Sequence, residues 1–207
     1  MTNKLRNVIL ALMVAGAASA AVAQTSGLIG ERYGAIDLGY VDAKGADLSS
    51  IGFELNVPSS IKGLDLSFHG GYANYDLDLS GLDAKAWNVS AKATGYMELD
   101  KGIKGFVAGA IGYEDLDMDY YGYSYTGRKN SFFYDVSVGA EIPCCSKASI
   151  RVALGHYDYT EWDEGAGLYA SLGANYWINE TVGLRGSYTR DFDDDSNGFS
   201  LGVVFKY

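Results

Sequence analysis

The amino-acid sequence predicts an all-β fold, a transmembrane antiparallel up-and-down β-barrel of ten strands, with eight strands as the alternative. Ten segments alternate between apolar and small or polar residues, which is the period of a strand with two different faces. The connections between these segments are alternately short and acidic. The last segment, 198–207, ends the chain on an apolar strand. In an open sheet such an edge would pair with other chains, and only closure removes it.

The first 23 residues have the features of a secretory signal peptide. Lys4 and Arg6 form a basic start, 8–20 is an apolar run rich in alanine, and 21–23 is a small-residue cleavage site. We expect cleavage near Ala23, leaving 24–207 as one barrel domain. Losing two basic residues changes the formal net charge from −10 to −12. A chain this acidic, without a basic patch, is not expected to bind nucleic acid.

Each expected strand is defined by apolar residues at every second position, because one face must meet lipid. In chain order, with part of each apolar face, the segments are 33–41 (Ile36, Leu38, Tyr40), 48–57 (Ile51, Phe53, Leu55), 64–75 (Leu66, Phe68, Tyr72), 84–99 (Trp87, Val89, Met97), 105–113 (Val107, Ile111, Tyr113), 130–142 (Phe132, Tyr134, Val136), 148–157 (Ile150, Val152, Leu154), 167–177 (Leu168, Leu172, Tyr176), 182–190 (Val182, Leu184, Tyr188) and 198–207 (Phe199, Leu201, Val203, Phe205, Tyr207). The fifth segment is glycine-rich, so which of its faces points outward is ambiguous, and we choose Val107, Ile111 and Tyr113 as the outward set. An eight-stranded barrel would omit this segment first.

The connections indicate which end of the barrel faces which side of the membrane. The short ones are 58–63, 100–104, 143–147 and 179–181, and the acidic ones are 42–47, 76–83, 114–129, 158–166 and 191–197. Bacterial barrels have short periplasmic turns and longer extracellular loops. We therefore expect the acidic set to be extracellular and both termini to be periplasmic. Cys144 and Cys145 are expected to be two free thiols in one of the short turns.

The faces opposite the apolar ones carry charge of both signs. These predicted lumen charges are Asp37, Glu54, Asp65, Lys92, Glu98, Asp135, Glu141, Arg151, Arg185 and Lys206, with His69 beside them. In a soluble β-sandwich, the structural alternative, this face would be solvated. In a narrow barrel such a mixture is expected to form ion pairs, since unpaired buried charge is too costly.

The strand pattern, the acidic connections and the closing Phe199-x-Leu201-x-Val203-x-Phe205-x-Tyr207 resemble the small outer-membrane β-barrel proteins of the OmpA/OmpX-like, porin-like type. The resemblance covers nearly all of 24–207, although its named members have eight strands. It implies the outer membrane of a Gram-negative bacterium, contact with lipid and lipopolysaccharide, and recognition of the terminal strand by the barrel-assembly machinery.

The resemblance and the residues together indicate a non-enzymatic barrel, structural or porin-like. A narrow channel for ions or small solutes is one alternative, and an adhesin that binds through the tyrosine-rich connection 114–129 is another. His69 and His156 lack a nucleophile motif nearby, so catalysis is not expected. No cofactor or dedicated metal site is expected. Weak, collective cation binding is predicted for Asp115, Asp117, Asp119, Asp193, Asp194 and Asp195.

Overall fold

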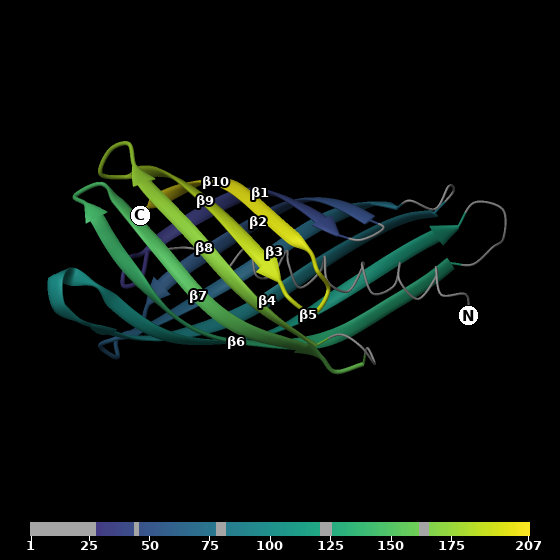
Figure 1. Cartoon of the computed structure of the whole chain (residues 1–207), viewed down its shortest axis with the longest axis horizontal. Coiled ribbons are helices and arrows are strands. Elements are labelled where there is room, and N and C mark those ends of the chain that lie inside the picture. The colour runs from purple at the N-terminus through teal and green to yellow at the C-terminus, as the bar shows by residue number, and fades with distance from the viewer. Residues whose placement is uncertain (1–27, 44–45, 78–81, 121–125, 162–165) are drawn as a thin grey trace.

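The computed structural model describes residues 28–43, 46–77, 82–120, 126–161 and 166–207 (Figure 1). The strands are β1 (Tyr33–Ala43), β2 (Ala46–Pro58), β3 (Leu64–Leu77), β4 (Leu82–Glu98), β5 (Lys104–Tyr120), β6 (Thr126–Cys145), β7 (Ala148–Tyr159), β8 (Gly167–Trp177), β9 (Val182–Asp191) and β10 (Asn197–Lys206), with a single 3-10 turn, η1 (Asp100–Gly102), between β4 and β5. None of the helical structure in these ranges is long and apolar enough to span a membrane. The predicted signal peptide lies outside the described residues.

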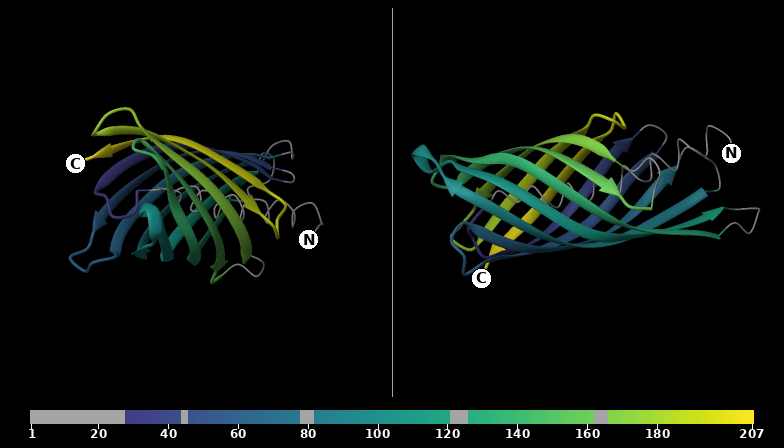
Figure 2. Two further views of the ribbon diagram at one scale, coloured as in Figure 1. Left: turned by 60° about the vertical axis from the view of Figure 1, so that its left-hand side comes forward. Right: turned by 90° about the horizontal axis from the view of Figure 1, so that it is seen from below.

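The ten strands form one closed antiparallel barrel, in which each strand pairs with its neighbours in sequence and β1 closes onto β10. The closing register places Asp37 opposite Gly202 of β10 and opposite Gly52 of β2. Figure 2 shows the strands wrapping around a common axis with a pronounced tilt. The prediction of ten strands is thus confirmed, and both the sandwich and the eight-stranded barrel are wrong.

The alternation of the sequence appears as an apolar outer face and a polar inner face. In the glycine-rich β5, Val107 and Ile111 are 63% and 71% exposed, whereas Phe106 and Ala108 are buried. The outward facing predicted for this strand is therefore confirmed. On the outside, the ring of Tyr113 contacts those of Trp87 and Phe132, with centroids 5.6 and 5.3 Å away.

The boundaries predicted for several acidic connections are wrong, because the strands extend into them. β4, β5 and β6 contain 17, 17 and 20 residues, more than the roughly 9 to 11 that a tilted strand needs to cross a bilayer. Glu114 lies opposite Ser131, and Asp117 lies opposite Arg128, so the β5–β6 ladder continues through a stretch expected to be loop. Polar residues on both faces removed the apolar alternation there, but cross-strand pairing does not require it.

The two ends of the barrel differ, and we name them by the chain termini. The terminal mouth is the end where β1 begins and β10 ends, at the left of Figure 1 near the C-terminus, and the distal mouth is the opposite end. At the terminal mouth β6 continues to Cys145 through a register irregularity between Pro143 and Cys145. Cys144 and Cys145 are free and exposed.

Candidate functional site in the barrel lumen

An ion network joins three strands in the middle of the lumen. The guanidinium of Arg185 on β9 donates from Nε to Asp37 Oδ1 at 2.6 Å and from Nη1 to Glu54 Oε2 at 2.5 Å. Its Nη2 also pairs with Asp37 Oδ2. The hydroxyl of Tyr33 donates to the other oxygen of Glu54 at 2.8 Å. All of these side chains are buried, so the pairing offsets a large cost of removing charge from water.

The space for this network comes from a glycine. Gly202 lies on β10, between the strands that carry Asp37 and Arg185. A Cβ added there would lie 2.1 Å from Asp37 Oδ1 and 2.5 Å from the carbonyl oxygen of Ile36. Any side chain at this position would therefore displace the carboxylate from the guanidinium.

Two further basic side chains point at the same carboxylate without completing a hydrogen bond. His69 Nε2 is 3.7 Å from Glu54 Oε1, and Lys92 Nζ is 3.9 Å from it. Both side chains are buried. Among the described residues, neither ring nitrogen of His69 nor the Lys92 ammonium has a hydrogen-bond partner. Both residues thus present polar atoms to the lumen.

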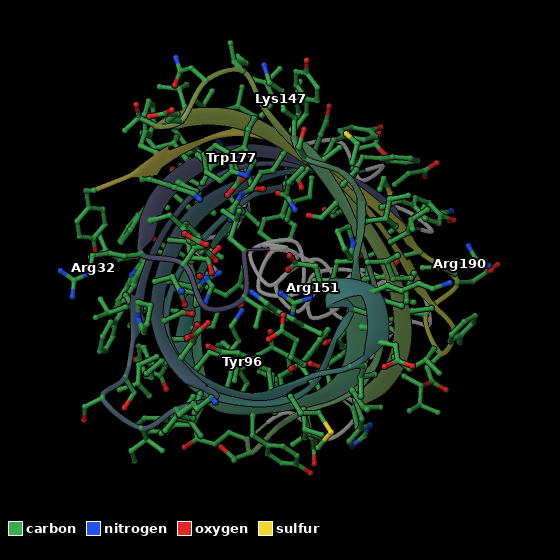
Figure 3. The ribbon with its side chains drawn as sticks, turned by 90° about the vertical axis from the view of Figure 1, so that its left-hand side faces the viewer. Arg32, Tyr96, Lys147, Arg151, Trp177 and Arg190 are labelled. Atoms are coloured by element: carbon green, nitrogen blue, oxygen red, sulfur yellow. The ribbon has the colours of Figure 1, made fainter. Side chains whose placement is uncertain are left out.

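The opposite wall of the lumen is lined with small residues at mid-strand. The inward positions there include Ser137 on β6, Ala153 on β7 and Ser171 on β8. Ala153 and Ser171 face inward yet are partly accessible, so this wall has unfilled space next to it. Arg151 projects into the lumen from the same side, with its guanidinium 4.0 Å from the centroid of the Phe106 ring (Figure 3). On β9 and β10, beside the ion network, the hydroxyls of Ser187 and Ser200 are hydrogen-bonded at 2.6 Å.

Towards the distal mouth, tyrosine hydroxyls donate to buried carboxylates. Tyr169 bonds Asp135 at 2.8 Å, Tyr157 bonds Asp191 at 2.8 Å and Tyr159 bonds Glu114 at 3.1 Å. The Tyr157 ring contacts both Tyr159 and Tyr169, with centroids 6.2 and 6.4 Å away. Tyrosine rings therefore line this half of the lumen together with its carboxylates.

The terminal mouth holds the short segment 28–31, which precedes β1. Leu28 and Ile29 are both 4% exposed. The carboxylates of Asp65 and Glu141 accept hydrogen bonds from the backbone N–H groups of Gly30 and Ile29, at 2.6 and 3.2 Å. The lumen is thus lined by charge along its length and occupied by backbone at one end.

This fold is shared by solved structures of outer-membrane β-barrels. The translocator domain of the autotransporter NalP from Neisseria meningitidis is 13% identical, with a TM-score of 0.51, over 95% of this chain and 97% of that one. An outer membrane channel from Pseudomonas putida F1 is 14% identical, with a TM-score of 0.55, over 86% and 96%. The β domain of the Bordetella autotransporter BrkA is 13% identical, with a TM-score of 0.53, over 86% and 100%. The chain has the fold of an outer-membrane β-barrel. No family model and no curated protein matches its sequence.

Most of the predicted lumen charges lie inside this outer-membrane β-barrel fold. Asp37, Glu54, Asp65, Lys92, Asp135, Arg151 and Arg185 are buried, and Glu141 and Lys206 are half-buried at the terminal mouth. Glu98 is exposed, which corrects its prediction as a lumen residue. It has the inward register, but it is the last residue of β4, where the wall ends.

Several residues of the lumen were missed in the sequence. Glu114 was placed in a loop, although it has the same inward period as Phe106 and Ala110 on β5. Tyr33, Tyr157 and Tyr169 also occupy inward positions but were not among the predicted lumen residues, which were chosen by charge. Continuing the two-residue alternation beyond the apolar part of each strand would have identified them as inward-facing.

The acidic residues predicted to bind cations collectively are not gathered in one place. Asp115 is buried on β5, so it does not belong to a solvated rim, whereas Asp117 is exposed and the side chain of Asp119 is outside the described part. Asp193 accepts the N–H of Leu168 at 2.7 Å, Asp194 lies 3.4 Å from the Tyr157 hydroxyl, and Asp195 pairs with Arg190. The described residues contain no group of three or more ligands positioned for a metal ion.

The remaining predicted features are on the outer surface. In the terminal strand motif Phe199, Leu201, Phe205 and Tyr207 are exposed, while Val203 is half-buried. His156 lies beside Tyr134 with ring centroids 6.2 Å apart. The adhesin alternative depends on the connection 114–129, of which 121–125 and the side chains of 118–120 and 126–129 lie outside the described residues.

Proposed function

We propose that this protein is a porin-like barrel of the Gram-negative outer membrane, which lets ions and small solutes through a narrow, hydrated lumen. It acts without catalysis or a cofactor. The short turns and both termini face the periplasm, and the distal mouth faces the outside. In its biogenesis the apolar face of β10 is the surface that the assembly machinery recognises.

One observation carries this proposal: buried polar atoms that line the lumen without a hydrogen-bond partner among the described residues. They are His69 Nδ1 and Nε2, Lys92 Nζ, Asp65 Oδ1, Glu114 Oε1, Asn175 Oδ1 and Thr189 Oγ1. Each would cost about 1–3 kcal/mol if nothing satisfied it. Water is the partner that a polar, roomy interior supplies. The small-residue wall opposite Glu54 provides that room.

The strand number limits what can pass. Eight strands enclose a space that side chains fill, whereas open aqueous channels belong to barrels of about 16 strands or more. A barrel of ten strands is just larger than one that side chains fill, and the Arg185 network occupies part of the cross-section of the lumen. The proposal is therefore a passage for ions and small solutes, not a general diffusion porin.

The lumen favours cations. Its inward carboxylates are Asp37, Glu54, Asp65, Glu114, Asp135, Glu141 and Asp191. The inward basic groups among the described residues are fewer: Lys92, Lys104, Arg151, Arg185 and Lys206, with His69. An excess of negative charge along a narrow passage raises the local concentration of cations and lowers that of anions.

The surface around the distal mouth suggests a second, weaker interaction. The exposed Asp117, Asp193 and Asp195 lie towards the distal mouth, the end that this proposal directs to the outside and to the lipopolysaccharide phosphates. Divalent cations would bridge the two sets of negative charge. Stripping divalent ions should then weaken association with lipopolysaccharide without unfolding the barrel.

The test is ion conductance of the refolded chain 24–207 in a planar bilayer, with folding confirmed by faster migration of the unheated sample on a denaturing gel. Small, discrete current steps are expected, with a reversal potential in a potassium chloride gradient that shows cation preference. Folded barrels that carry no current, both as 24–207 and with residues 24–31 removed, would contradict the proposal.

A further inference from the structure

The segment before β1 forms a tight turn inside the terminal mouth. The N–H of Glu31 donates to the carbonyl of Leu28 at 3.0 Å, which closes a four-residue β-turn. Gly30, the third residue, has φ +84°, a conformation that suits glycine at this position of a type II turn. A Cβ at Gly30 would lie 2.8 Å from the Tyr96 hydroxyl. In Figure 3, which looks into this end, the segment bends inward across the opening.

The barrel wall holds the backbone of this turn from several sides. Asp65 on β3 accepts the Gly30 N–H at 2.6 Å, and Glu141 on β6 accepts the Ile29 N–H at 3.2 Å. The Lys104 ammonium on β5 donates to the Ile29 carbonyl at 2.5 Å. The Asn56 amide on β2 donates to the Glu31 carbonyl at 2.6 Å. Four strands thus contribute side chains that recognise main-chain groups.

Two apolar recesses receive the side chains of the turn. Leu28 packs with Tyr33, Ala35 and Val204, against Trp177. Ile29 packs with Phe106 and Ala108, against Tyr96 and Ala153. The recesses lie on different parts of the wall, β1 with β10 for one and β5 for the other. Together with the four hydrogen bonds, they fix the turn across the opening instead of along one side of it.

Nothing in the ladder holds this segment, because strand pairing begins at Tyr33. Its attachments are side chain to backbone bonds, apolar contacts and the ion pair of Glu31 with Lys206 at 2.9 Å, which is partly exposed to solvent. Such a segment can leave the mouth without breaking any pair of the barrel. Asp65 and Glu141 would then line an aqueous opening, where water replaces the backbone donors.

We propose that residues 28–31 are a gate: they occupy a main-chain binding site on the wall of the terminal mouth, and their release opens the lumen. This inference rests on the proposed channel function. The site recognises a short peptide turn by its backbone, with two carboxylates for N–H groups and an ammonium and an amide for carbonyls. The turn is supplied by the chain itself.

The test measures, in planar bilayers, the fraction of time that the channel is open, which we call the occupancy. It compares the chain 24–207 with two variants of it. The double variant Asp65→Asn/Glu141→Gln removes both charged acceptors, and Gly30→Ala strains the turn and crowds Tyr96. The matched control is Glu98→Gln/Asp100→Asn, which removes the same charge at the same end from exposed residues away from the turn. Because a neutral amide oxygen accepts a hydrogen bond more weakly than a carboxylate does, we expect roughly a tenfold or greater rise in the fraction of time that the channel is open for the double variant and none for the control.

A second readout follows the gate without relying on current. With Cys144 and Cys145 replaced by serine, Ile29→Cys is treated with a water-soluble maleimide in the folded barrel, and Lys101→Cys serves as the exposed reference. The Ile29→Cys thiol should react at least about tenfold more slowly than the reference, because it is buried. Adding Asp65→Asn/Glu141→Gln should restore much of the reference rate.

The two readouts separate the gate from the channel. Slow labelling that the double variant accelerates, together with its higher occupancy, supports the gate. Equal labelling of both cysteines, or equal occupancy in all conducting forms, overturns the gate and leaves the channel standing. Protected labelling with no current in any form, including one without 24–31, overturns the channel and with it the gating role.

Discussion

At the scale of single residues, the Arg185 guanidinium determines how the lumen is organised. It bonds two carboxylates from β1 and β2, and Glu54 in turn is the nearest acid to His69 and Lys92. A buried charge without a partner lowers the stability of the fold, whereas paired buried charges are tolerated. Removing one member of this network should therefore cost more folding free energy than removing one member of an exposed ion pair.

Replacing Arg185 with alanine should destabilise the folded barrel by about 3–5 kcal/mol, because two buried carboxylates lose their main partner. Arg190→Ala is the matched control, since Arg190 pairs with Asp195 with its side chain 33% exposed and that of Asp195 72% exposed. Its loss should cost no more than about 1 kcal/mol. Urea unfolding in lipid vesicles measures both. Equal costs for the two variants would show that the central network does not stabilise the fold.

Gly202→Ala tests the space that the network needs. The new methyl would approach the Ile36 carbonyl, which is backbone and cannot rotate away, as well as Asp37. We expect a loss of about 1–3 kcal/mol in the same unfolding experiment. Gly186→Ala, on the adjacent strand, would meet no atom closer than 3.4 Å and should be nearly neutral. A neutral Gly202→Ala would mean that the carboxylate has room to move.

At the scale of elements, the alternation predicted the existence and facing of every strand, including β5. The predicted ends of β4, β5 and β6 were too short, since pattern reading depends on an apolar face and these strands lose it near the distal mouth. Pairing such as that of Lys85 with Asp117 maintains the ladder there through backbone hydrogen bonds. Charged residues on the outer face therefore indicate where a strand leaves the lipid, and the strand itself can continue beyond that point.

The distal part of the β5–β6 hairpin should be dispensable for folding. Met118 and Gly127 are directly opposite, so replacing 119–126 by Asn-Gly keeps the register and forms a two-residue turn. Because this part extends beyond the length needed to cross the bilayer, we expect a stability change under about 1 kcal/mol. Heat-dependent gel migration and urea unfolding measure it. Failure to fold would show that the extension is part of the barrel's folding core.

At the scale of the whole molecule, closure of the barrel creates contacts that no pattern in the sequence reveals. Alternation predicted which charges face inward, but not their partners. Arg185 and Asp37 are 148 positions apart, and they meet only because β1 closes onto β10 in one register. The contact between Gly30 and Asp65 likewise depends on where the chain enters the mouth. Most charged residues of the lumen could be predicted from alternation, whereas their pairing could not.

The balance of lumen charge should set ion selectivity. Arg151→Gln removes a buried cation from the lumen, so the preference for potassium over chloride should increase, as seen in the reversal potential across a salt gradient. Lys147→Gln is the control, because Lys147 is exposed at the terminal mouth (Figure 3). Equal shifts for both variants would place the selectivity at the rim instead of the interior.

The central claim is that a hydrated passage runs beside the small-residue wall. The measurement that tests it most directly compares the single-channel conductance of Ser171→Trp with that of Ala170→Trp. These neighbours lie on β8 and face opposite sides, Ser171 into the lumen and Ala170 towards lipid. An indole at position 171 would fill the space opposite the charged wall, while the same group at 170 would lie in the bilayer. The account predicts that current falls to a small fraction in Ser171→Trp and is unchanged in Ala170→Trp. Folded variants with equal conductance would contradict it, since ions would then not pass through the lumen.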